Sequence, residues 1–309
     1  MTEFQSPYAY LFQKTDTFKS EDGLDIRYVS LKTHLEKARG TVILLNGWTE
    51  FIEKYGEPIS VILKKGFNVY AMDWRGQGRS SRSLPDPEKG YVRDYSEFVQ
   101  DLQKFVDTIV DPKAVKPLIL MAHSMGGNIS TQYLQANPGK MDRAILSCPM
   151  FDLPAGSPLK IAFKTLSTLA RGVGKGSAYV PGRNGWKEIP FEENMVTSDP
   201  DRYEHDLELL RQNKDLRIGG PTYIWLSATL KALKRVQSEK FLKAIELPVM
   251  IYSAEKDTIV PPSSHEVASK QMPDCKLVTI PNAKHELLRE SDAIQQVYWE
   301  EFDVFLKDL

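Results

Sequence analysis

A serine between small residues stands at the junction of a predicted strand and a predicted helix. The apolar run 117–121 is followed by Ala122-His123-Ser124-Met125-Gly126-Gly127, and helical spacing comes next. This order nearly matches Gly-x-Ser-x-Gly, in which a tight strand-to-helix turn exposes a serine hydroxyl. Free N–H groups at the start of the helix favour negative charge that develops there. We therefore predict that Ser124 is a nucleophile, against the alternative of an ordinary serine in a turn.

A serine nucleophile requires a base, and the base must be oriented by an acid. His285 lies in the loop after the last predicted strand, where the base belongs when the chain order is serine, acid, histidine. A lone loop histidine is otherwise solvated surface, and four further histidines compete: His34, His123, His205 and His265. His123 adjoins the serine and is expected to point away from the place where a base must stand.

The acid is expected in the loop that follows the predicted strand 248–252. This loop reads Ser253-Ala-Glu255-Lys-Asp257-Thr-Ile-Val-Pro261. Asp257 is the predicted acid because of its place in the loop, and Glu255 is the alternative, more typical of a surface charge.

An acyl-transfer site also needs N–H donors for an oxyanion. One predicted donor is the backbone N–H of Met125, immediately after the serine. The second is expected from the loop Asn46-Gly47-Trp48-Thr49, where Gly47 allows close backbone approach and the N–H of Trp48 is the candidate. The alternative is that Asn46-Gly47 forms only a turn.

The segment 73–80, Asp-Trp-Arg-Gly-Gln-Gly-Arg-Ser, superficially resembles a phosphate-binding loop. It lacks the Lys-Ser/Thr pair of a P-loop and the spacing of a dinucleotide fingerprint, so a structural turn is predicted. The sequence has no His, Cys and Asp cluster with metal-site spacing, and we expect neither a metal nor a cofactor.

The elements that must position these residues alternate between strands and helices. Short buried runs predict strands at 41–45, 67–72, 117–121, 143–148, 248–252 and 276–280. Helical spacing follows at 50–65, 95–110, 126–136, 263–270 and 291–307. A hairpin over 13–31, with its turn at 20–23, is expected at one edge of the sheet. The alternation predicts an α/β fold with a mostly parallel sheet flanked by helices.

The alternation is interrupted once, by the 98 positions 149–246. They contain Gly- and Pro-rich stretches and helical segments at 158–170, 200–212 and 222–243. Because the apolar residues here are scattered, we predict a helical cap that lies over the sheet. The predicted division is a core of 1–148 and 247–309, with the cap insertion at 149–246.

Composition excludes several classes of protein. The chain has 309 residues with 40 Lys+Arg and 41 Asp+Glu, so its charge does not indicate a nucleic-acid partner. Two cysteines are too few for a disulfide framework and suggest a reducing, cytoplasmic compartment. The N-terminal sequence does not read as a secretory signal, and no apolar run approaches a membrane span. The oligomeric state is not indicated.

Together these residues resemble the α/β-hydrolase superfamily, and within it the serine aminopeptidase S33-type branch that includes monoacylglycerol lipases and bacterial lysophospholipases. His-Ser-Met-Gly-Gly at 123–127 and Asp-x-Arg-Gly-x-Gly-x-Ser at 73–80 match that branch. The segments 199–203 and 217–225 look like the cap of bacterial lysophospholipases of the L2 type. The resemblance implies the triad Ser124, Asp257 and His285. The branch often has His-Gly-small residue where this chain has Asn46-Gly47-Trp48, which leaves the second oxyanion donor open.

The resemblance implies a serine hydrolase that cleaves carboxylic esters of monoacyl lipids through an acyl-enzyme. The alternatives are a short-chain carboxylesterase, a peptidase of the same fold, or a non-catalytic binding scaffold. Five apolar cap residues are expected either to line an acyl-chain tunnel or to pack on the sheet: Leu159, Ile161, Phe163, Leu166 and Leu169. The cap carries 15 Lys+Arg and 12 Asp+Glu, which suits an anionic headgroup or peripheral contact with a membrane face, or is ordinary scatter of surface charge.

Overall fold

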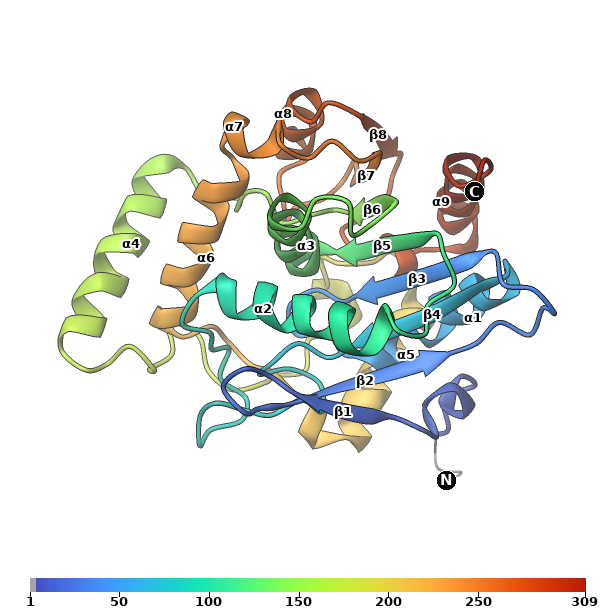
Figure 1. The fold of residues 1–309 in the computed structure, drawn as a ribbon. Helices are drawn as coiled ribbons and strands as arrows, with labels where there is room; N and C mark the ends of the chain where they lie inside the picture. The colour runs from blue at the N-terminus through green and yellow to red at the C-terminus, as the bar shows by residue number, and fades with distance from the viewer. Residues whose placement is uncertain (1–3) are drawn as a thin grey trace.

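An eight-stranded sheet forms the centre of the molecule in the computed structural model, which describes residues 4–309 apart from the side chains of Ser157 and Leu159 (Figure 1). The strand order is β1-β2-β4-β3-β5-β6-β7-β8. Pairing is parallel from β4 through β3 to β8, and β2 runs antiparallel to both of its neighbours. The strands are β1 (Asp16–Lys19), β2 (Asp25–Leu31), β3 (Gly40–Leu45), β4 (Phe67–Met72), β5 (Leu118–His123), β6 (Arg143–Ser147), β7 (Val249–Ala254) and β8 (Cys275–Ile280).

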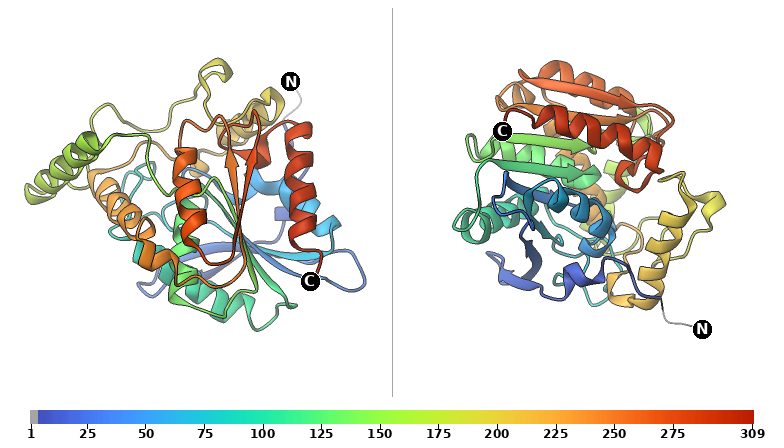
Figure 2. Two further views of the ribbon diagram at one scale, coloured as in Figure 1. Left: turned by 90° about the horizontal axis from the view of Figure 1, so that it is seen from above. Right: turned by 90° about the vertical axis from the view of Figure 1, so that its right-hand side faces the viewer.

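Helices cover both faces of this sheet (Figures 1 and 2). Each face has its own apolar core. One core contains residues of α2 (Tyr95–Phe105), α3 (Ser124–Ala136) and α8 (Pro262–Gln271). The other contains residues of α1 (Gly56–Lys64) and α9 (Asp292–Phe305). The central strands β3, β5 and β7 are buried along their whole length, because parallel strands are covered on both faces.

The predicted strands all form, and the predicted hairpin lies at the sheet edge with Gly23 at φ +86° in its turn. Three predicted helices are divided in the structure, and the one over 95–110 becomes α2 followed by a π-helical turn over Val106–Val110. The first, over 50–65, becomes a short 3-10 helix η2 (Ile52–Tyr55) followed by α1. The one over 222–243 becomes α6 (Tyr223–Val236) and α7 (Glu239–Leu242), because α6 ends at Val236 and Ser238 starts a new turn.

The parallel strands place their following loops at one edge of the sheet. Register pairs Leu45 of β3 with Ala122 of β5, and His123 of β5 with Ser147 of β6. The loops after β3, β5, β6, β7 and β8 therefore meet at this edge, which is where ligand sites form in open α/β sheets.

The chain between β6 and β7 contributes no strand to the sheet among the described residues. It contains α4 (Ser157–Gly172), α5 (Pro200–Gln212), α6 and α7. Helix α4 packs on α6 and projects from the body of the molecule, whereas α5 lies on another side, near η2 (Figures 1 and 2). Of the residues described, no helix combines the length and apolarity that a membrane crossing requires.

Candidate active site

The turn between β5 and α3 holds Ser124 in a conformation that few non-glycine residues adopt. Its φ is +50°, and the two glycines that follow allow close packing around it. A Cβ on Gly126 would collide with the carbonyl oxygen of Asn46, and one on Gly127 would lie 2.7 Å from the Cβ of Pro149. The small residues after the serine are thus required because the loops after β3 and β6 press against this turn.

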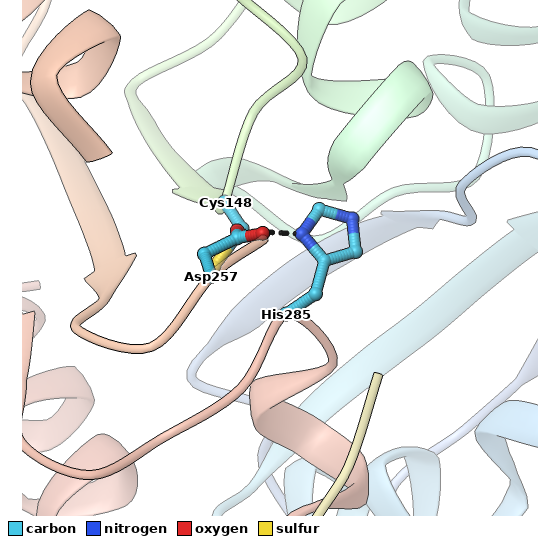
Figure 3. Close-up of side chains that lie close together, drawn as sticks. All are labelled: Cys148, Asp257 and His285. Carbon is cyan, nitrogen blue, oxygen red and sulfur yellow. Dashed lines mark hydrogen bonds and ion pairs between the residues drawn. The ribbon is translucent and has the colours of Figure 1, made fainter. Parts of the chain in front are cut away.

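Ser124 is the first member of a hydrogen-bonded row. Its Oγ lies 2.9 Å from Nε2 of His285, and Nδ1 of His285 lies 2.6 Å from Oδ2 of Asp257 (Figure 3 shows the second contact). All three residues are buried. Because the carboxylate accepts a hydrogen bond from the Nδ1–H of His285, the ring carries its proton at Nδ1, and Nε2 keeps its lone pair for the serine hydroxyl. The row places the base between nucleophile and acid.

Asp257 is held in its ionised form. Burial raises the pKa of this carboxyl, but the hydrogen bond and charge of His285 outweigh burial and leave the pKa lowered. The second oxygen of Asp257 accepts the N–H groups of Ile259 at 2.8 Å and Val260 at 2.9 Å. Glu255, the alternative acid, is exposed and accepts the N–H of Asn282. The structure thus brings Asp257, and not Glu255, to the histidine.

The other histidines have partners elsewhere. His34 is exposed, and His205 contacts Ser6 and Asp206. His265 is buried between the hydroxyl of Ser253 and the carbonyl of Pro149, and burial lowers its pKa to about 4. His123 is turned away from the serine hydroxyl, as expected, but it supports the site in a way that the sequence did not indicate.

His123 connects two loops of the site. Its Nδ1 lies 3.0 Å from a carboxylate oxygen of Glu50, and its Nε2 lies 3.3 Å from the backbone carbonyl of His285. Both partners are acceptors, so both ring nitrogens donate only when the imidazole is protonated. Burial lowers the pKa of His123, but the neighbouring Glu50 carboxylate outweighs it, and the pKa is raised.

The same Glu50 oxygen also fixes the loop after β3. It accepts the N–H of Gly47 and the hydroxyl of Tyr55, the latter at 2.7 Å. Burial raises the pKa of Glu50, yet the charges of Lys54 and His123 hold it well below its usual range. Glu50 is therefore an ionised anchor beneath the loop that approaches Ser124.

Lys54 joins this anchor to the insertion between β6 and β7. Its side chain is only 11 % exposed and reaches Glu50 at 3.0 Å, Glu286 at 2.6 Å and Asp206 of α5 at 3.9 Å. Burial lowers the pKa of Lys54, but the three carboxylates outweigh it and raise the pKa. One cation thus links the loop after β3, the loop that carries His285, and a helix of the insertion.

Gly47 brings the loop after β3 against the nucleophile. A Cβ at this position would lie 3.1 Å from the Cβ of Ser124. The N–H of Gly47 is bonded to Glu50, and its carbonyl accepts the side chain of Gln77 at 2.9 Å. Among the described residues no acceptor is bonded to the next N–H, that of Trp48. The Trp48 ring stacks on Trp225 of α6 with centroids 4.5 Å apart.

Segment 73–80 forms a structural turn. Asp73 accepts the backbone N–H of Ile52 and of Arg79, and Ser80 donates to the carbonyl of Asp73. Because Asp73 bonds Ile52 of η2 and Gln77 bonds Gly47, this turn supports η2 and the loop after β3.

Cys148 is a neighbour of the acid that spacing along the chain did not predict. It follows β6 with φ +44° and lies beside Asp257 and His285, the ligand atoms of the three within 4.8 Å of one another (Figure 3). Burial raises the pKa of its thiol well above the usual value, so the sulfur is a neutral thiol. Metals bind the thiolate, and the facing atoms of Asp257 and His285 bond each other. The group therefore does not fit a metal ion.

The apolar residues of α4 are placed differently from the expectation. Ile161 and Leu169 are exposed on the helix, Leu166 is partly so, and Phe163 is half-buried. Leu159 lies outside the described side chains. Ile161 and Leu169 neither line an enclosed tunnel nor pack on the sheet, because α4 contacts the rest of the molecule mainly through α6.

Known proteins with similar sequences are named as lipid hydrolases. The chain is 31 % identical to lysophospholipase L2 of Escherichia coli K12 over 288 residues, which cover 91 % of this chain and 83 % of that protein. It is 26 % identical to a monoacylglycerol lipase of Mycolicibacterium smegmatis, with 82 % and 84 % covered.

Solved structures share the fold. A soluble variant of monoglyceride lipase from Saccharomyces cerevisiae superposes with a TM-score of 0.74 at 19 % identity, covering 98 % of this chain and 99 % of the other. The α/β-hydrolase fold predicted from the sequence is confirmed. Residues 36–292 match the family described as Serine aminopeptidase, S33, and because this match spans most of the chain, the protein belongs to that family of hydrolases.

Proposed function

We propose that this protein is a serine hydrolase that cleaves the carboxylic ester of a monoacyl lipid, with Ser124 as nucleophile, His285 as base and Asp257 as the orienting acid. The observation that carries the proposal is the row Ser124 to His285 to Asp257, with contacts of 2.9 and 2.6 Å. The names of the relatives, lysophospholipase and monoacylglycerol lipase, support the substrate class.

The reaction begins when Oγ of Ser124 bonds to the ester carbonyl carbon and His285 takes the serine proton at Nε2. The carbonyl oxygen becomes an oxyanion, for which we propose the N–H groups of Met125 and Trp48 as donors. The bond to the alcohol oxygen then breaks, and His285 gives its proton to the departing alcohol. Asp257 stabilises the imidazolium while it carries that proton.

Water completes the cycle. His285 takes a proton from a water molecule, whose oxygen bonds to the acyl carbon. The bond from that carbon to Oγ breaks, and the proton returns to Ser124, releasing a fatty acid. Every proton transfer in this scheme uses the side chains of the row.

We infer that residues 149–246 act as a cap that selects the substrate. Its α6 reaches the loop after β3 through the Trp225–Trp48 stack, and its α5 reaches Lys54 through Asp206. Such contacts bring the insertion next to the proposed nucleophile. A reducing, cytoplasmic compartment is part of the proposal, since Cys148 and Cys275 are both free thiols.

The direct test is active-site labelling with a fluorophosphonate probe. Ser124→Ala is expected to remain folded, to take no label and to hydrolyse no ester. The matched control is Ser130→Ala, which changes a buried serine of the same helix that is not part of the row. Labelling of the Ser124→Ala protein would contradict the assignment of the nucleophile.

The substrate class needs a separate panel. Lysophospholipids and monoacylglycerols of equal chain length are expected to be cleaved faster than p-nitrophenyl acetate or an aminoacyl amide. Faster cleavage of the acetate would indicate a short-chain esterase, and cleavage of the amide alone a peptidase. If the folded wild-type protein accepts the label but cleaves no substrate of the panel, Ser124 is still a reactive nucleophile, but the assignment of a lipid substrate is wrong.

A further inference from the structure

The side chain of Gln77 spans the backbone of the loop after β3. It is buried, and its Nε2 donates to the carbonyl of Gly47 at 2.9 Å and lies 3.4 Å from the carbonyl of Glu50. Its Oε1 accepts the N–H of Thr49 at 3.1 Å. Two carbonyls face one end of the amide and an N–H faces the other, so the partners fix which end is the nitrogen. The amide is thus committed to this one loop.

The bond to Gly47 also fixes the direction of the next N–H. The carbonyl of Gly47 and the N–H of Trp48 belong to one planar trans peptide unit, in which the two groups point in opposite directions. While Gln77 holds the carbonyl, the N–H of Trp48 therefore faces away from Gln77. A Cβ on Gly47 would lie 3.1 Å from the Cβ of Ser124, so this peptide unit adjoins the proposed nucleophile.

The other contacts of this loop act on neighbouring groups. Glu50 holds the N–H of Gly47, which belongs to the preceding peptide unit. The stack on Trp225 restrains the ring of Trp48, but a peptide unit can rotate while the ring stays in place. Such a rotation changes mainly ψ of Gly47 and φ of Trp48, and glycine tolerates a wide range of backbone angles. Gln77 is therefore the contact that acts on this peptide unit directly.

The turn after β4 keeps Gln77 itself in place. Gly76 and Gly78, on either side of it, have φ of +77° and +49°, and a Cβ on Gly78 would collide with the carboxylate of Asp73. The backbone N–H of Gln77 donates to the carbonyl of Trp74 at 3.0 Å. This glycine-rich turn thus aims a buried amide at the loop beside the nucleophile.

We propose that Gln77 is a positioning residue that directs the N–H of Trp48 toward the oxyanion of the acyl-transfer reaction. The inference rests on the proposed function, in which Trp48 is the second oxyanion donor. Gln77 acts through the peptide unit and not on the substrate. Because an oxyanion forms only as the reaction proceeds, loss of Gln77 should lower kcat and leave KM nearly unchanged.

Gln77→Glu keeps the shape of the side chain but removes the donor. An ionised carboxylate at this position repels the carbonyl of Gly47, although it still accepts the N–H of Thr49. Removal of one oxyanion donor lowers kcat about 10²–10³-fold. At about pH 8 we therefore expect kcat on p-nitrophenyl butyrate to fall about 100-fold, with KM within about threefold of wild type.

The introduced carboxyl also provides a readout that a merely structural role would not move. When it is protonated, its O–H can donate to the carbonyl of Gly47 while its other oxygen accepts the N–H of Thr49. Burial raises the pKa of a carboxyl. The ratio of variant to wild-type kcat is therefore expected to rise as the pH falls from about 8 to about 5. Gln77→Met has a similar length but no titratable group, and its loss of kcat is expected at every pH.

Gln295→Glu is the matched control. Gln295 of α9 is also buried, donates to the carbonyl of Glu290 at 3.0 Å and accepts the N–H of Trp299 at 3.4 Å. Urea unfolding should show a comparable loss of stability in both variants, while Gln295→Glu keeps the wild-type kcat and pH profile.

A trifluoromethyl ketone gives an independent measurement of the oxyanion site. Oγ of Ser124 bonds to its carbonyl carbon, and the carbonyl oxygen becomes the oxyanion of a hemiketal. Its inhibition constant should rise in Gln77→Glu by about the factor that kcat/KM loses, because the hemiketal and the transition state carry the same charge.

An unchanged kcat in Gln77→Glu, a loss that does not shrink at lower pH, or an equal loss in Gln295→Glu would overturn this inference. Each of these results, obtained with an active wild type, would leave the proposed function intact. A wild-type protein that cleaves no ester would overturn both. If Gln77→Glu does not fold, an unchanged kcat in Gln77→Met overturns the inference in its place.

Discussion

Asp257 keeps His285 in the tautomer that presents a lone pair to Ser124. In Asp257→Asn the amide can donate to Nδ1, which favours the opposite tautomer, so kcat should fall about 10⁴-fold with the fold intact. Steady-state kinetics on a p-nitrophenyl ester measure kcat, and circular dichroism shows whether the fold is intact.

Glu255→Gln is the matched control for this change. Glu255 lies in the same loop but is exposed and contacts Asn282 rather than the histidine. Its replacement should leave kcat within a few fold of wild type. A larger loss in Glu255→Gln than in Asp257→Asn would mean that the acid has been assigned to the wrong residue.

Glu50 provides a second prediction for a single residue. Glu50→Gln keeps the size of the side chain but removes the charge that faces Lys54 and the imidazole of His123. Breaking a buried ion pair costs about 3 kcal/mol of unfolding free energy. We expect kcat to fall as well, because the same carboxylate holds the N–H of Gly47 beside Ser124.

Glu53→Gln separates these two effects. Glu53 is also buried and pairs with Arg27, at 2.7 Å, away from Gly47. Urea unfolding should show a comparable loss of stability in both variants, while kcat should fall only in Glu50→Gln. An unchanged kcat in Glu50→Gln would show that the loop keeps its position without the charge.

Sequence reasoning found the row of three side chains because each follows a recognisable strand in a fixed chain order. It did not find the roles of Glu50, His123 and Cys148. These depend on which loops the strand order β4-β3-β5-β6-β7 brings together, and spacing along the chain carries no information on such contacts.

Among the elements, α8 is attached to the sheet by a histidine that is buried in its neutral form. His265 accepts from Ser253 of β7 and donates to the carbonyl of Pro149, and burial lowers its pKa to about 4. The unfolded chain binds a proton at this histidine near pH 6.5, whereas the folded protein does so only near pH 4. Between these values the unfolded state holds more protons, so stability is lost as the pH falls.

Replacing His265 with Gln should remove part of this pH dependence. The wild-type free energy of unfolding should fall between pH 6.5 and pH 4 by about 3 kcal/mol more than that of His265→Gln, because each unit of pKa difference corresponds to about 1.4 kcal/mol. His34→Gln, at an exposed position, is the control. Parallel curves for wild type and His265→Gln in urea titrations would contradict this account.

Elements were predictable where the pattern is strong. Buried runs located β3 to β8, and the turn at 20–23 located the hairpin of β1 and β2. The signal is strongest for β3, β5 and β7, since a strand covered on both faces is apolar throughout. The places where helices divide could not be predicted, because the segments 50–65 and 222–243 keep helical spacing across the breaks at Gly56 and Ser238. The sequence also did not predict which side of α4 faces solvent. Its apolar residues have the spacing of a packed helix, yet several of them are exposed.

For the molecule as a whole, the proposed cap should make catalysis depend on acyl-chain length. Each buried methylene stabilises a complex by about 0.8 kcal/mol, so two added carbons correspond to more than tenfold when the gain is realised in the transition state. We expect kcat/KM on monomeric p-nitrophenyl esters to rise steeply from acetate to octanoate. A flat or falling series, measured below the critical micelle concentration, would remove the claim of an acyl-chain site.

A further prediction for the whole molecule concerns the headgroup of the lipid substrate. The cap's small excess of Lys+Arg over Asp+Glu favours a phosphate-bearing headgroup if that charge acts in catalysis. Lysophospholipids should then be cleaved faster than monoacylglycerols of equal chain length. Equal rates would leave the acyl-chain claim in place and give the charge no catalytic role.

The contact of Lys54 with Asp206 bears on how the insertion 149–246 could be exchanged for a different segment. Asp206 of α5 also receives Arg289 at 2.8 Å, so a single cap carboxylate neutralises cations from two parts of the core. A chimaera that received an insertion without an acid at this position would leave Arg289 with Glu57 as its remaining carboxylate, while Lys54 would keep its closer partners Glu50 and Glu286. The two parts of the chain therefore constrain each other's sequence, and a transplanted insertion that brings the carboxylate should give a more stable chimaera than one that lacks it.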